Sequence, residues 1–206
     1  MKLLFLHGLG QGPESWDETI RALGPEPDAA CPDLFGLCGG GARDYPGLYA
    51  AFEGYTGGFP EPVALCGLSL GAVLALDYAT RHPERVCKLI LVAPQYRMPK
   101  LLLRLQNIVF GLMPERAFAG AGMGKKEIIR LTSSMIPLDF RGKLDHVTCP
   151  TLILLGERDT ANRKAAGELA KLLPHAAARE IPGAGHEVNR DAPRELAAAI
   201  RGFCEE

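Results

Sequence analysis

Short apolar runs alternate with longer segments of helical spacing along most of the chain. Near-continuous apolar runs are typical of parallel strands that are buried on both faces. Such runs occupy residues 3–6, 63–66, 87–93 and 151–155. Residues 29–34, which form a weaker pattern, and residues 178–181 are two further predicted strands. Apolar positions recur at helical spacing within residues 72–81, 163–173 and 192–203. Strands that alternate with helices predict an α/β fold, with about six mostly parallel strands in one sheet and helices on both of its faces.

One connection between predicted strands is unusually long. Residues 94–150 exceed by far the dozen or so residues that a simple crossover needs. Within them, residues 101–113 and 128–136 are apolar helical segments, and glycines separate the two at positions 120, 122 and 124. We expect a small helical lid over residues 95–140, inserted on the carboxyl side of the sheet. The alternative is additional core packing, because apolar stripes at helical spacing usually belong to a core.

Composition restricts the classes of function. The chain has 206 residues, of which 47% are hydrophobic and 23% charged, as expected for one globular domain spanning residues 1–206. The formal net charge is −1 and no run of Lys or Arg occurs, so no nucleic-acid partner is expected. We expect the binding partner to be a small-molecule substrate.

The cysteines and the apolar segments bear on the cellular location. Six cysteines are scattered without a Cys-x-x-Cys pair, which favours reduced thiols over zinc ligands or a disulfide framework. The apolar run at the start is too short for a signal peptide. No segment reaches the ~18 apolar residues of a membrane span. We therefore expect a cytoplasmic protein that does not span a membrane.

Ser69 is the candidate nucleophile. It lies in Gly67-Leu68-Ser69-Leu70-Gly71, a Gly-x-Ser-x-Gly pattern that follows a predicted strand and opens a predicted helix. Flanking glycines let the backbone turn sharply, so that the hydroxyl projects above the edge of the sheet. The helix N-terminus beside it places N–H groups and a positive dipole end near developing negative charge. The alternative is an ordinary N-capping serine in a glycine-rich turn.

A serine hydroxyl needs an adjacent base, and His186 is the candidate. It follows the last predicted strand in a glycine-rich loop, residues 182–186, which allows the imidazole to reach over the carboxyl edge of the sheet. His7 is expected instead to pack and orient the first loop. The remaining histidines are better explained as solvated side chains: His82, His146 and His175.

The base in turn needs a carboxylate that fixes its tautomer and stabilises its charged form. Two candidates follow the strand at residues 151–155, namely Glu157 and Asp159. We favour Asp159, because it lies further into the loop, where its carboxylate can reach the loop that follows the next strand. Asp159 as a simple helix cap is the alternative interpretation.

The chain order Ser69, Asp159, His186 resembles that of the α/β-hydrolase superfamily. The motifs that carry this resemblance are His7-Gly8 after the first strand, residues 32–36, the Gly67–Gly71 turn, residues 156–159 and Gly185-His186. The resemblance spans nearly the whole chain except the lid. It implies the three-layer sandwich of that fold. The two antiparallel strands that usually lead the fold have no counterpart, so one sheet edge must be covered or paired, and both monomer and dimer stay open.

The resemblance implies a serine hydrolase that transfers an acyl group to water. Ser69, Asp159 and His186 would form the catalytic triad, and the backbone N–H groups of Leu9 and Leu70 the oxyanion hole. Ester hydrolysis is the expected reaction, and no metal or organic cofactor is required. Carbon–carbon bond hydrolysis or a lyase reaction on the same fold is the alternative, followed by a non-catalytic binding protein.

An apolar lid implies a partly apolar substrate. We expect Leu105 and Phe110 to contact it, and Lys100 or Arg104 to steer an anionic end.

Overall fold

The computed structural model describes residues 1–118 and 122–205. Their strands form one parallel sheet in the order β2-β1-β3-β4-β5-β6. The strands are β1 (Lys2–Leu6), β2 (Asp28–Ala30), β3 (Val63–Leu68), β4 (Val86–Val92), β5 (Thr151–Gly156) and β6 (Ala176–Ile181). The helices are α1 (Asp17–Leu23), α2 (Tyr45–Thr56), α3 (Leu70–Arg81), α4 (Lys100–Leu112), α5 (Lys125–Met135), α6 (Thr160–Leu172), α7 (Val188–Asp191) and α8 (Pro193–Glu205).

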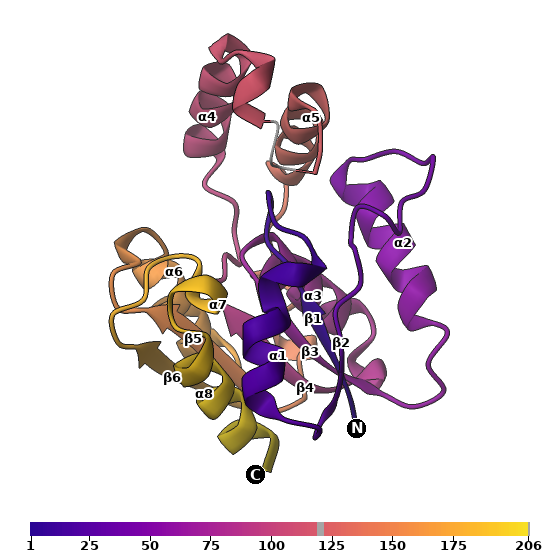
Figure 1. The fold of residues 1–206 in the computed structure, drawn as a ribbon, viewed down its shortest axis with the longest axis vertical. Helices are drawn as coiled ribbons and strands as arrows, with labels where there is room; N and C mark the ends of the chain where they lie inside the picture. The colour runs from indigo at the N-terminus through magenta and orange to yellow at the C-terminus, as the bar shows by residue number, and fades with distance from the viewer. Residues whose placement is uncertain (119–121, 206) are drawn as a thin grey trace.

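Helices cover the sheet on both faces, as the alternating pattern predicts. Figure 1 shows α1 and α8 side by side in front of the sheet, where they contact each other extensively. Helix α3 packs against β1, β3 and β4. Strands β1, β3, β4 and β5 occupy the middle of the sheet, and their apolar side chains are almost entirely buried. These are the strands that a continuous apolar run identifies most clearly.

The second strand is shorter than the sequence predicts. Residues 29–34 were expected to be extended, whereas β2 ends at Ala30. Pro32 has no N–H to donate to a neighbouring strand. The Asp33 side chain then accepts hydrogen bonds from the N–H groups of Phe35 and Gly36, which turns the chain away from the sheet. A very short strand at the edge offers little backbone for pairing with another chain.

Helices α1 and α2 were not among the predicted elements. Helix α2 contains Pro46, Gly47 and Gly54, which weaken a helical pattern. Its N-terminus is capped by Asp44, whose side chain accepts from Gly47 N–H.

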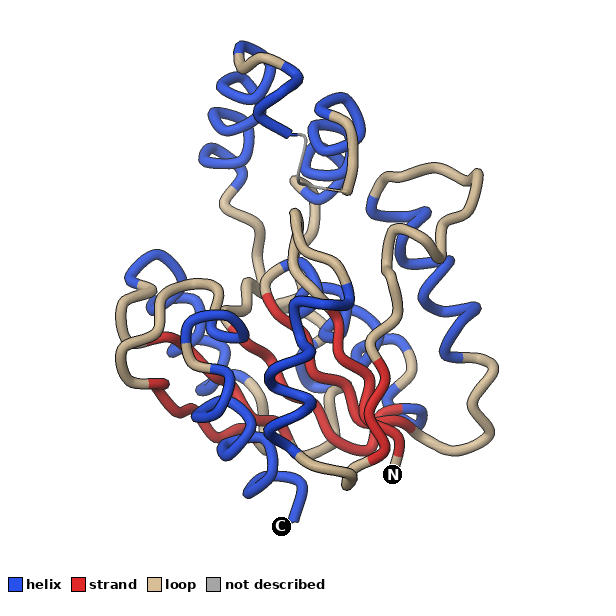
Figure 2. The backbone as a smooth tube through the Cα atoms, viewed as in Figure 1, coloured by secondary structure: helices blue, strands red, loops and turns tan. Residues whose placement is uncertain are grey.

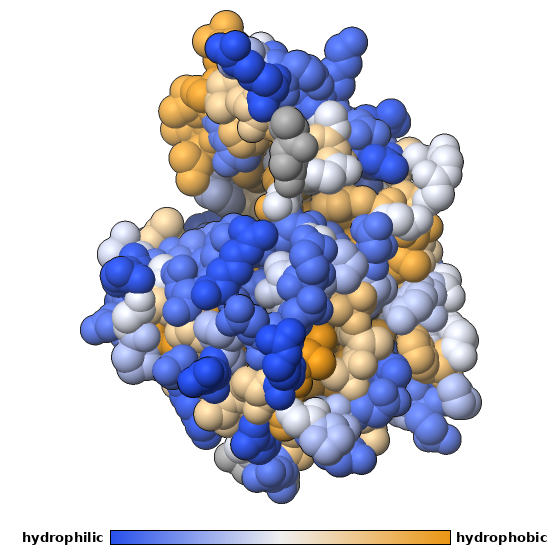
Figure 3. All heavy atoms as spheres, viewed as in Figure 1, coloured by the Kyte–Doolittle hydropathy of each residue, from blue (hydrophilic) through white to orange (hydrophobic). Residues whose placement is uncertain are grey.

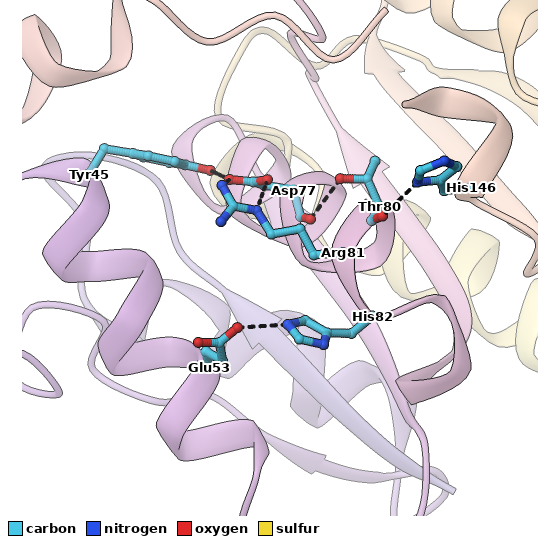
Figure 4. Close-up of polar contacts among 7 residues, drawn as sticks. All are labelled: Tyr45, Glu53, Asp77, Thr80, Arg81, His82 and His146. Atoms are coloured by element: carbon cyan, nitrogen blue, oxygen red, sulfur yellow. Dashed lines mark hydrogen bonds and ion pairs between the residues drawn. The ribbon is translucent and has the colours of Figure 1, made fainter. Parts of the chain in front are cut away.

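Helix α2 is held in place by a buried polar cluster on α3 (Figure 4). The Tyr45 hydroxyl donates to Asp77 at 3.0 Å, and Arg81 donates to the same carboxylate at 2.7 Å. Asp77 is fully buried, so this pairing satisfies a charge that would otherwise be costly. Burial raises the pKa of Tyr45 well above its ordinary value, and the neighbouring Asp77 raises it further. The cluster thereby joins α2 to the helix that begins directly after Ser69.

Between β4 and β5 the chain leaves the sheet and forms α4 and α5. The two helices pack against each other and stand beyond the carboxyl ends of the strands, at the top of Figures 1 and 2. An isolated bridge between Arg97 and Asp139 joins the two ends of this segment, close to the predicted limits of 95 and 140. Of the glycines expected between its helices, Gly122 and Gly124 are described, and Gly120 lies outside the described residues. None of the helices within residues 1–118 and 122–205 has the length and apolarity needed to cross a membrane.

Candidate active site

Ser69 occupies a sharp turn between β3 and α3, as predicted. Its φ of 53° and ψ of −109° form a conformation that L-residues rarely adopt, and such strained positions cluster at functional sites. The turn is compact because two glycines allow close backbone approach. A Cβ on Gly67 would lie 2.2 Å from the Gly71 carbonyl oxygen, and one on Gly71 would lie 2.1 Å from the Leu6 carbonyl oxygen. Both glycines of the motif are therefore needed for this turn.

Asp159 and His186 meet at the carboxyl edge of the sheet. Asp159 follows β5, and His186 lies in the loop that follows β6. The His186 Nδ1 and Asp159 Oδ2 atoms are 2.8 Å apart. The Asp159 side chain is 3% exposed and that of His186 is 45% exposed, so the carboxylate is shielded while the ring reaches solvent. Water competes little for a shielded hydrogen bond, which favours a fixed ring orientation.

Glu157 contacts a different part of the same loop. Its side chain accepts a hydrogen bond from the Gly183 N–H at 2.7 Å. It makes no polar contact with His186 in the part of the chain that the structure describes. The two carboxylates therefore have separate contacts, and Asp159 is the one beside the imidazole.

Ser69 and His186 line one pocket of about 440 Å³. Across residues 1–118 and 122–205 no hydrogen bond links the Ser69 hydroxyl to His186, and in many enzymes such a contact tightens only when substrate binds. The wall of the pocket is mostly apolar and is completed by α4 and α5. Its apolar residues are Leu9, Leu70, Val73, Ala93, Met98, Pro99, Leu102, Leu103, Met135 and Ala161.

Leu9 and Leu70, the predicted oxyanion donors, both line this pocket. Leu70 is the first residue of α3, so its N–H has no carbonyl four residues earlier in the helix to bond. Leu9 lies in the loop after β1, where the Gln11 side chain accepts from the preceding N–H, that of Gly8. In the described part of the chain neither Leu9 nor Leu70 donates this N–H to a protein acceptor. Among the described residues, both N–H groups therefore lack a protein acceptor, and both residues line the same pocket as Ser69.

His7 supports this loop from beneath, as expected from the sequence. It is fully buried, its Nδ1 lies 3.0 Å from the Gly8 carbonyl oxygen, and its Nε2 accepts from the Leu34 N–H. Burial lowers its pKa, which favours the neutral ring that accepting this hydrogen bond requires. His82 was expected to be solvated, but its Nε2 atom lies 2.7 Å from the Glu53 carboxylate (Figure 4).

Asn162 and Gln95 also contact the site, although no sequence motif predicts them. The Asn162 side-chain nitrogen lies 3.0 and 2.8 Å from the two carboxylate oxygens of Asp159, and 3.0 Å from His186 Nδ1. Gln95 donates to the Asn162 side-chain oxygen at 2.7 Å. Asn162 thus orients the carboxylate, and Gln95 orients Asn162. A signal was present, because a polar residue three positions after a helix-capping Asp can reach back to it.

Leu105 and Phe110, the expected substrate contacts, do not line the pocket. Leu105 is 56% exposed on the outer side of α4, and Phe110 packs edge-on against Phe118 with ring centroids 5.4 Å apart. The residues of α4 that do line it are Leu102, Leu103 and Gln106. The helix was predicted correctly, but a helix that is apolar on most sides does not reveal which side faces the pocket.

Comparison with known proteins identifies the family. The model of the alpha/beta hydrolase family matches residues 3–199. The chain belongs to this family. Its resemblance to the superfamily and the predicted sandwich of parallel strands and helices are thereby confirmed.

The alpha/beta hydrolase relatives include esterases. Over 90 residues, which are 44% of this chain and 36% of the relative, the chain is 38% identical to the pimeloyl-acyl carrier protein methyl ester esterase of Aromatoleum aromaticum. It is 25% identical to the esterase of the same name from Vibrio parahaemolyticus, over 99% of this chain and 94% of the relative. A thermophilic esterase from Thermogutta terrifontis has the same fold, with a TM-score of 0.83 and 22% identity over 100% of this chain and 89% of the other. The chain spans less than half of the length of three of the curated relatives that it matches.

Proposed function

We propose that this alpha/beta hydrolase cleaves a carboxylic ester, or a similar acyl bond, of a small and partly apolar substrate. One observation carries the proposal. Ser69, on a strained turn, shares a pocket with His186, and His186 pairs with the shielded carboxylate of Asp159. The esterase relatives support the same reaction class.

In the proposed reaction, Ser69 Oγ attacks the carbonyl carbon while His186 Nε2 accepts the hydroxyl proton. The electron pair of the carbonyl moves to its oxygen, and the N–H groups of Leu9 and Leu70 donate to that oxyanion. When the intermediate collapses, His186 returns the proton to the leaving alcohol. Water then repeats the sequence on the acyl-enzyme and releases the acid. Asp159 holds the ring with Nδ1 protonated, and Asn162 holds Asp159.

Residues 95–140 form the proposed lid of this pocket. Leu102 and Leu103 of α4 and Met135 of α5 supply apolar wall to the pocket that Ser69 also lines. A wall of this kind favours an apolar acyl or alcohol group. Lys100 and Arg104 lie on the same helix and are proposed to attract an anionic end of the substrate.

A panel of p-nitrophenyl esters with graded acyl chain length tests the reaction class. We expect turnover with release of one acid and one alcohol per bond cleaved, identified by product analysis. Cleavage of a carbon–carbon bond, with no ester turnover, would contradict ester hydrolysis and support the alternative hydrolase or lyase reaction. Substrate binding without turnover of any kind would indicate a binding protein.

The wall of the pocket should set the preference among these esters. Fully burying a leucine side chain contributes ~1.5–3 kcal/mol, so Leu103→Ala should change the ratio of kcat/KM between long and short esters by about tenfold to a hundredfold. Phe110→Ala is the matched control on the same helix, because Phe110 packs against Phe118 outside the pocket. We expect it to lower the melting temperature and leave the ratio unchanged. An unchanged ratio in Leu103→Ala would contradict the lid assignment.

A further inference from the structure

Helix α4 carries an exposed apolar surface of which only one residue, Leu102, also lines the pocket. Large apolar side chains on it are between 47% and 84% exposed. They are Leu101, Leu102, Leu105, Ile108, Val109 and Leu112, called the α4 patch below. In the rest of residues 1–118 and 122–205, only Met1 and Leu172 are large hydrophobic residues of comparable exposure. In Figure 3 the patch is the orange area at the upper left. Contiguous exposed apolar patches commonly mark interaction sites.

Around the axis of α4, the patch is bordered on one side by residues that face α5 and the pocket, and on the other side by cations. At about 3.6 residues per turn, its side chains share one side of α4. Leu103, Gln106 and Phe110, which are less exposed, lie on the adjoining side toward α5 and the pocket. Leu102 belongs to both the patch and the pocket wall, so the apolar surface is continuous with the mouth of the pocket.

The other border of the patch is cationic. Lys100 and Arg104 lie there on the same helix, and neither forms an ion pair with another described residue. Helices α4 and α5 together hold five Lys or Arg residues and one acidic residue, a formal charge of +4, whereas the whole chain has −1. Positive charge is therefore concentrated on the part of the molecule that carries the patch.

We propose that the α4 patch docks this protein onto a lipid surface that bears anionic headgroups. A helix with one apolar side and cations beside it lies in the plane of such a surface, with the apolar side chains among the acyl chains and the cations at the headgroups. A second copy of this chain fits less well, because two pairs of helices with charge +4 would face each other. A soluble acidic protein would match the charge, whereas a lipid surface matches both the charge and an apolar strip that extends along the whole helix.

Docking in this way would bring the mouth of the pocket to the lipid surface through Leu102. A partly apolar ester could then enter the pocket from that surface without crossing water. This part of the inference rests on the proposed function, whereas the docking itself does not.

Vesicle binding by the Ser69→Ala variant tests the docking without hydrolysis of the lipid. We expect this variant to cosediment with vesicles of phosphatidylcholine and phosphatidylglycerol, and more weakly with phosphatidylcholine alone or at high salt. Ile108→Gln/Leu112→Gln, added to Ser69→Ala, should lower the partition coefficient about tenfold or more, because glutamine keeps helix propensity but removes apolar surface. Lys100→Gln and Arg104→Gln should each lower binding to the anionic vesicles about fivefold.

The control is Leu172→Gln, which removes an exposed leucine of α6 and should leave vesicle binding unchanged. With Ser69 intact, Ile108→Gln/Leu112→Gln should keep the turnover of a water-soluble ester, so a loss of docking and a failure of the esterase proposal remain distinguishable. The docking proposal is overturned if Ser69→Ala binds neither kind of vesicle, or if the double substitution in α4 leaves its binding unchanged. It is also overturned if sedimentation equilibrium shows a dimer that Ile108→Gln/Leu112→Gln dissociates, because the patch would then be an interface between copies.

Discussion

Ser69→Ala should lower kcat for ester hydrolysis by about four to six orders of magnitude and abolish covalent labelling by a fluorophosphonate probe. The loss is expected to be this large because the three residues of a triad act as a unit, and the nucleophile cannot be replaced by its neighbours. Stability should change little, since no hydrogen bond of the Ser69 side chain is present among the described residues. The measurements are kcat on the best ester of the panel, peptide mapping of the label, and the melting temperature.

Ser133→Ala is a matched control for the labelling. Ser133 lies on α5, and its hydroxyl accepts a hydrogen bond from the Asn107 side chain. Ser133 lies outside the pocket wall. We expect full labelling and normal kcat in this variant. A label mapped to Ser133 or Ser134, or retained in Ser69→Ala, would exclude Ser69 as the nucleophile.

The middle of the sheet could be predicted because it is buried on both faces. Strands such as β4 and β5 must be apolar at nearly every position, and this pattern differs from that of any surface element. The turn at Ser69 could be predicted for a related reason. Close backbone approach demands glycine at positions 67 and 71, so the residue types at these two positions indicate the turn.

The contacts on α4 could not be predicted in the same way. The helix is apolar toward the pocket and also toward solvent, and composition does not distinguish the side that lines a cavity from the side that is exposed. The pattern therefore predicted the helix but not the separate positions of Leu103 and Leu105. The contact of Asn162 with Asp159 could not be predicted from the motif, because the pattern that places Asp159 beside His186 does not indicate which side chain holds the carboxylate itself.

Asp159→Asn should lower kcat about a thousandfold to ten-thousandfold, whereas Glu157→Gln should keep it within about twofold. An asparagine at position 159 can donate to Nδ1 of His186, which favours the wrong tautomer, and it carries no charge to stabilise the protonated ring. Folding should be preserved, because asparagine caps a helix as well as aspartate does and Asp159 is the N-cap of α6. Glutamine at position 157 keeps an oxygen that can accept from the Gly183 N–H.

The comparison of these two variants decides between the carboxylates that the sequence left open. Both change one oxygen of a carboxylate to an amide nitrogen, so the size and shape of the side chain are matched. Melting temperatures measured alongside kcat show whether either effect arises from unfolding. The reverse ranking would assign the role to Glu157, and near-normal rates in both variants would mean that the His186–Asp159 contact at 2.8 Å does not orient the base. We expect the large effect at Asp159, because its side chain alone of the two is shielded from water and adjoins the imidazole.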